Sequence, residues 1–123
     1  EGRMFTVTIG DEQKTYETFT EMIGDLLGCS VQVFTKSCTS LDDLNNKEKF
    51  MISIAKISTD FMKKNKHVLQ VNESYFLEEL KKASQPDASQ PAMSLDELVF
   101  GAIGGMAEGY WLKHQQQKYD SPN

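Results

Sequence analysis

Residues 94–114 read SLDELVFGAIGGMAEGYWLKH, and this stretch decides the architecture of the chain. Ser94, followed three residues later by Glu97, forms a capping box, which is a sequence signal for the start of a helix. At about 100° per residue, the apolar side chains of this helix cover roughly 260° of its circumference. A helix with so wide an apolar surface must be covered on most sides, either by the rest of the chain or by a partner.

Three glycines recur along this helix at intervals of four residues, so they line one flank of the apolar stripe. Each costs about 0.8–1 kcal/mol relative to alanine inside a helix, and the bare ridge lets another backbone approach closely. Two interpretations stay open: the ridge packs inside the protein's own core, or it binds a protein partner such as a second copy of the chain. The residues expected to bind a protein are Phe100, Gly101, Gly105, Met106, Gly109, Tyr110 and Trp111.

The composition places the chain among ordinary globular domains. A length of 123 residues suffices for one domain with a core that needs neither disulfides nor metal. The net charge of -5 favours solubility and argues against a general affinity for nucleic acid. The apolar run from Leu98 to Ala107 is about half the ~20 residues of a membrane span, so no span is expected. No targeting pattern precedes Met4, and a cytoplasmic location is the expectation.

The first 35 residues predict a small antiparallel sheet. Residues 5–9 alternate apolar and threonine side chains, the pattern of a half-buried strand. Residues 10–13 predict a turn, and residues 14–17 a weaker second strand that completes a hairpin. Residues 31–35, with Val31 and Val33 alternating with polar neighbours, predict a third strand that joins the hairpin.

Helical periodicity accounts for most of the remaining sequence. Thr18 and Glu21 form a capping box for a short helix that Gly28 is expected to end. A longer amphipathic helix follows Ser40 and closes at residues 63–67, and another follows Asn72. Residues 68–71 fit either a short strand or the end of a helix. With the helix at 94–114, the expected fold is α+β, a small antiparallel sheet packed with about four helices.

The domain organisation follows from these elements. Residues 1–83 form the α+β body, and residues 84–93, which contain Pro86 and Pro91, form a linker that cannot be helical or strand-paired throughout. Residues 94–114 are the tethered, glycine-ridged helix. Residues 115–123 are polar and predict a disordered tail.

The chain shows no pattern typical of an active site or a metal site. Asp42 and Asp43 form a carboxylate pair, but acids in the first turn of a helix are explained by the helix dipole. Cys29 and Cys38 fit no zinc motif, and flanking a predicted strand they are expected to be free thiols. We therefore expect no catalytic residue, metal or cofactor, and a non-enzymatic protein-interaction module, such as a regulator, inhibitor or assembly chaperone.

Two alternative functions rest on weaker signals. The basic cluster of Lys63, Lys64 and Lys66 could contact phosphates in a nucleic-acid accessory protein, although a cap at the end of a helix needs the same residues and no partner. No aromatic residues alternate with these lysines to stack on bases, so nucleic acid is not the expected partner. A small ligand would have to bind along the three glycines of the ridge.

Overall fold

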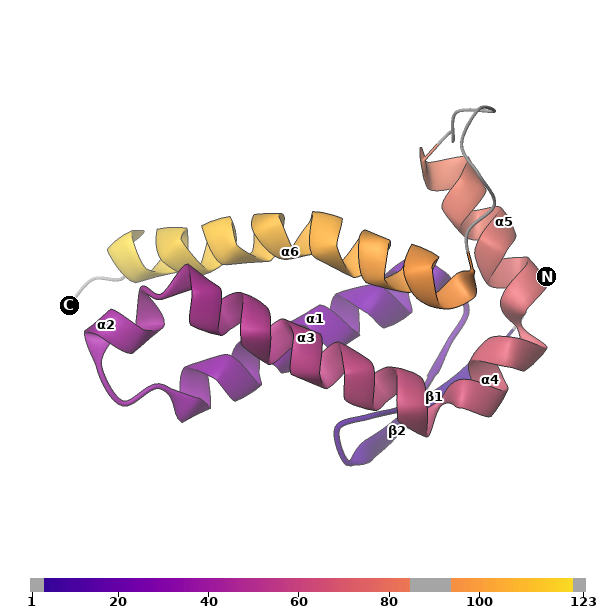
Figure 1. The fold of residues 1–123 in the computed structure, drawn as a ribbon, viewed down its shortest axis with the longest axis horizontal. Helices are drawn as coiled ribbons and strands as arrows, with labels where there is room; N and C mark the ends of the chain where they lie inside the picture. The colour runs from indigo at the N-terminus through magenta and orange to yellow at the C-terminus, as the bar shows by residue number, and fades with distance from the viewer. Residues whose placement is uncertain (1–3, 85–93, 121–123) are drawn as a thin grey trace.

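The computed structural model describes residues 4–84 and 94–120. Its elements are β1 (Phe5–Ile9), β2 (Glu12–Tyr16), α1 (Phe19–Ser37), α2 (Leu41–Leu44), α3 (Lys47–Lys64), α4 (Lys66–Val71), α5 (Glu73–Ser84) and α6 (Leu95–Asp120). The fold is α+β, as the sequence predicts, with the hairpin packed beside the junction of α3 and α4 and α6 running lengthwise over α1 and α3 (Figure 1).

The hairpin is antiparallel and tightly closed. Phe5 pairs with Tyr16 and Ile9 with Glu12, so the connection is only two residues long. Gly10 lies at a φ of 65°, a conformation that glycine adopts without steric cost. This turn is tighter than the predicted one at residues 10–13, and β2 therefore begins at Glu12.

The predicted third strand is wrong, because residues 31–35 lie inside α1 and the sheet has two strands. The buried stripe of α1 continues past Gly28 through Ser30 and Phe34, which lie four residues apart on one helical face. The Ser30 hydroxyl donates a hydrogen bond to the carbonyl oxygen of Leu26 at 3.0 Å. The alternation of Val31 and Val33 indicated a strand, but this helical spacing prevails.

The number of helices is larger than predicted, with six in the described ranges. The helix expected after Ser40 is divided into α2 and α3, because Asn46 starts a new helix by accepting a hydrogen bond from the Lys49 amide at 3.1 Å. Residues 68–71, for which strand and helix were both open, belong to α4. The helix predicted over residues 94–114 is longer in the structure, where α6 continues to Asp120. Most of the predicted linker, residues 85–93, lies outside the described residues, as do residues 121–123.

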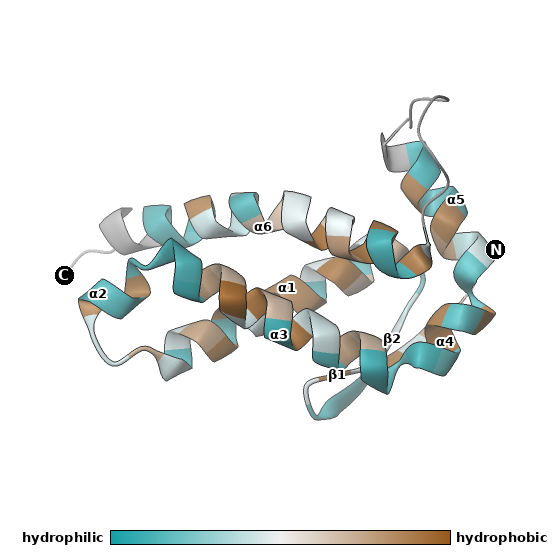
Figure 2. Cartoon of the chain, in the orientation of Figure 1, coloured by the Kyte–Doolittle hydropathy of each residue, from teal (hydrophilic) through white to brown (hydrophobic). Residues whose placement is uncertain are grey.

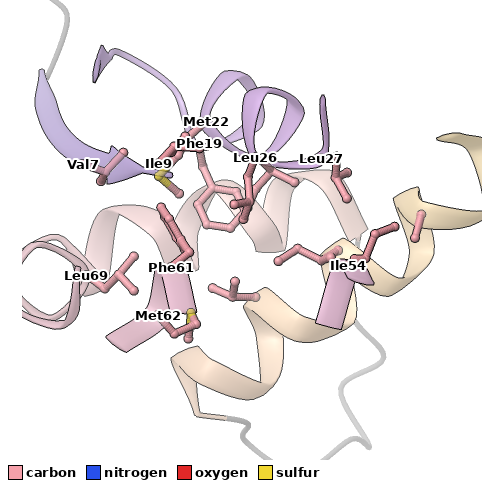
Figure 3. Packing of buried hydrophobic residues seen from close by; sticks show 14 of the residues in the cluster. Val7, Ile9, Phe19, Met22, Leu26, Leu27, Ile54, Phe61, Met62 and Leu69 are labelled. Carbon is pink, nitrogen blue, oxygen red and sulfur yellow. The ribbon is translucent and has the colours of Figure 1, made fainter. Parts of the chain in front are cut away.

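The core is formed where α1, α3 and α6 meet the buried face of β1. Figure 3 shows side chains from β1, α1, α3 and α4 converging on one apolar cluster. Met22, Ile23, Leu26 and Leu27 of α1 are fully buried. Asn65, at the end of α3, links the sheet to this core. Its side chain accepts a hydrogen bond from the Thr8 amide at 2.7 Å and donates to the Thr8 and Phe61 carbonyl oxygens at 2.8 and 2.9 Å.

Among the described residues, no helix combines the length and the apolar character that a bilayer crossing requires.

Candidate protein-binding face on α6

One side of α6 belongs to the core. Its buried residues follow one another at steps of four along the helix, and α6 packs on α1, α3 and α5 through this line. Trp111 lies 8% exposed with its ring centroid 5.1 Å from that of Phe50. The interpretation that α6 is a core helix is therefore correct for this side. The buried line consists of Leu95, Val99, Ile103, Ala107 and Trp111.

Polar contacts fix the helix on both flanks and at its start. The Tyr110 hydroxyl donates to the carbonyl oxygen of Gly24 in α1 at 3.4 Å, and Glu108 pairs with Lys47 of α3 at 2.5 Å. The predicted capping box is present: Ser94 accepts from the Glu97 amide at 3.2 Å, and Glu97 accepts from the Ser94 amide at 2.9 Å. These contacts place α6 in one rotation about its axis and so decide which residues face outward.

The glycines of the ridge lie on the side opposite the core. A Cβ atom built on Gly101, Gly104, Gly105 or Gly109 would meet no described atom within 4 Å, apart from immediate helix neighbours. These glycines are therefore not needed for packing within the described chain. Figure 2 shows the middle of α6 as a pale band, whereas α1 and α3 carry apolar segments along their length.

Large apolar side chains flank the bare ridge. Phe100 is 41% exposed and Leu112 is 64% exposed. Both lie on the row of residues 100, 104, 108 and 112, which runs beside the glycines and winds by about 40° at each step of four. Together with the glycines and three charged residues, they form what we call the outer face of α6. It consists of the exposed residues Glu97, Phe100, Gly101, Gly104, Gly105, Glu108, Gly109, Leu112 and Lys113.

The structure divides the seven residues predicted to bind a protein. Phe100 and the three predicted glycines lie on the outer face, whereas Met106 and Tyr110 are half-buried at its border and Trp111 lies in the core. Gly104 and Leu112 belong to the face as well and were not predicted as binding residues. Their spacing of four and twelve residues from Phe100 is the signal that could have found them.

The basic cluster is only partly free to bind phosphate. Lys64 donates to the carbonyl oxygen of Gly10 at 3.0 Å and pairs with Asp60 at 3.2 Å. Lys63 and Lys66 line an open hollow of about 350 Å³, which Glu73 and Asp96 also line. Two acids beside two bases give this hollow no net attraction for a polyanion. The hollow also lies at the start of α6, away from the glycines along which a small ligand was expected.

The pKa shifts of Asp43, Tyr16 and Cys38 have structural causes. Hydrogen bonds from Lys49 and Thr39 hold the pKa of Asp43 below its ordinary value, and burial together with Asp25 raises that of Tyr16. Burial raises the pKa of the Cys38 thiol. Cys29 and Cys38 are free and half-buried, as expected. Within residues 4–84 and 94–116, no group of three or more His, Cys, Asp or Glu could hold a metal ion.

Comparison with known proteins adds no relative: no family model, curated protein sequence or solved structure matches the chain.

Proposed function

We propose that this protein is a non-enzymatic protein-binding module, in the class of regulators, inhibitors and assembly chaperones, and that its partner docks on the outer face of α6. The carrying observation is the open surroundings of Gly101, Gly104, Gly105 and Gly109 on a helix whose opposite side is well packed. Four glycines inside a helix cost about 3–4 kcal/mol relative to alanine. No contact within the described chain compensates for this cost, whereas close approach of a partner backbone would.

The chemistry of the outer face favours a protein over other ligands. Phe100 and Leu112 expose apolar surface beside the glycines, and aromatic side chains are enriched at the centres of protein interfaces. The face carries two acids, Glu97 and Glu108, and one base, Lys113, which suits neither a nucleic-acid backbone nor an anionic membrane. A helix surface without walls offers no concave site that could enclose a small ligand.

Site-specific photo-crosslinking tests the proposal. p-Benzoylphenylalanine in place of Phe100, an exposed aromatic side chain beside the glycines, should give a covalent adduct in cells, and mass spectrometry would identify the attached chain. Ala55, an exposed small residue on α3, is the matched control position and should give no adduct. The identified protein is then titrated with the purified parent, with Gly105→Leu and with Ala55→Leu. If Gly105→Leu and Ala55→Leu bind the partner with equal affinity, the assignment of the face is overturned.

A further inference from the structure

Resting on the proposed function, we infer that the partner is a second copy of this chain, whose α6 packs antiparallel on the first around a two-fold axis through Gly105. The outer line of α6, opposite its buried line, runs through residues 97, 101, 105, 109 and 113 at steps of four. This line carries an acid at one end, three glycines in the middle and a base at the other end. It is therefore complementary to a second copy of itself that runs in the opposite direction.

The charges determine the direction of the second helix. Glu97 and Lys113 are both exposed and each lies eight residues from Gly105, about 12 Å along the helix. In an antiparallel pair, Glu97 of each copy lies opposite Lys113 of the other, which gives two complementary pairs. A parallel pair would place acid opposite acid and base opposite base. Opposite charges across an interface favour one register and disfavour the other.

The apolar side chains fit the same axis. Phe100 lies about 7.5 Å to one side of Gly105 along the helix, and Leu112 lies about 10.5 Å to the other side, on the same flank. A two-fold axis brings this flank of one copy against the same flank of the next, so residue i meets residue j and residue j meets residue i. Phe100 of one copy therefore lies within about 3 Å, along the helix, of Leu112 of the other. The two exposed side chains then lie at the same border of the contact.

The glycines occupy the centre of this contact. Gly105 faces its own equivalent and Gly101 faces Gly109, so no Cβ separates the two backbones where they come closest. The distance between packed helix axes depends on the side chains at the contact, and small residues allow the closest approach.

The solution mass provides the first test. Sedimentation equilibrium of the parent chain should show a reversible dimer at micromolar concentration. Gly105→Leu and Lys113→Glu should each weaken dimerisation at least tenfold, whereas the matched controls Ala55→Leu and Lys56→Glu on the exposed side of α3 should leave it unchanged. Far-UV circular dichroism shows whether each variant is folded. A parent that stays monomeric at 500 µM overturns the inference.

Cysteine crosslinking tests the axis itself, in a chain with Cys29→Ser and Cys38→Ser. Gly105→Cys should form a disulfide-linked dimer under mild oxidation. Gly101→Cys alone should not, because its two copies lie about 12 Å apart along the helix and a disulfide needs Cα atoms within about 7 Å. A mixture of Gly101→Cys and Gly109→Cys should form the mixed dimer. Self-linking of Gly101→Cys would indicate a parallel pair and overturn the inference.

The two proposals fail separately. A monomeric parent whose crosslinker at position 100 captures a different, identified protein that Gly105→Leu no longer binds overturns self-pairing and retains the protein-binding function. A monomeric parent that gives no adduct with the crosslinker at position 100 overturns both.

Discussion

Replacing all four outer-face glycines with alanine should stabilise the folded monomer. Alanine gains about 0.8–1 kcal/mol over glycine at each interior helix position, so the fourfold variant should gain about 3–4 kcal/mol in the free energy of unfolding. The structure sets no opposing cost, because each new methyl group meets no described atom within 4 Å outside its own stretch of helix. The four substitutions are Gly101→Ala, Gly104→Ala, Gly105→Ala and Gly109→Ala.

Urea unfolding followed by far-UV circular dichroism measures this gain. The protein concentration should be low enough for sedimentation to show only monomer, and the dependence on urea should be unchanged, so that the midpoint reports stability. Gly10→Ala is the matched control. Its φ of 65° should make the same chemical change cost about 1–2 kcal/mol. Destabilisation of the fourfold variant would show that the glycines make an internal contact, and would refute the reasoning behind both proposals.

Three further outcomes are expected. Asn65→Ala should lower the free energy of unfolding, measured in urea, by about 1.5–4.5 kcal/mol. The reason is the loss of three hydrogen bonds at about 0.5–1.5 kcal/mol each. A change near zero would contradict the role given to this buried side chain. The hydrogen bonds from Ser94 lower the pKa of Glu97 below its ordinary 4.5, so its stabilisation is present above that pH and is lost as the pH falls. The parent should therefore exceed Glu97→Gln in thermal stability at pH 6 and not at pH 3, and an equal advantage at both would argue against this contact. Finally, gel-shift assays of the parent should detect no salt-sensitive binding of nucleic acid. Binding that disappears when Lys63, Lys64 and Lys66 are all replaced with glutamate would contradict this prediction.

The sequence predicted those parts of the fold that local signals determine. The capping residues Thr18, Ser40 and Ser94 start helices as expected, since each places a side-chain oxygen at the amide three residues later. The alternation in residues 5–9 correctly predicted β1, because one face of that strand is buried. The coarse fold class followed from these local patterns.

Tertiary packing decided what the sequence did not predict. A run such as residues 31–35 has strand propensity, yet Phe34 is buried as part of a helical stripe whose partners lie on α3 and α6. The same limit applies to the candidate face. Periodicity showed that α6 has a wide apolar surface, but only the packed structure shows that Trp111 lies inside and Phe100 outside. Sequence spacing alone cannot fix the rotation of a helix that is apolar on most sides.

The arrangement of side-chain sizes along α6 matches the gap between two crossed helices. Residues at steps of four wind slowly around a helix, because four steps of about 100° overshoot a full turn by about 40°. Helices that meet along such rows cross at an angle, commonly near −50°, and are closest only at the crossing point. Gly101, Gly105 and Gly109 occupy that point, where any side chain would hold the backbones apart. Phe100, Leu112, Glu97 and Lys113 lie farther out, where the gap widens and only a long side chain can reach across it. Glu108 lies nearer the crossing point, but it pairs with Lys47 of α3 in the same copy.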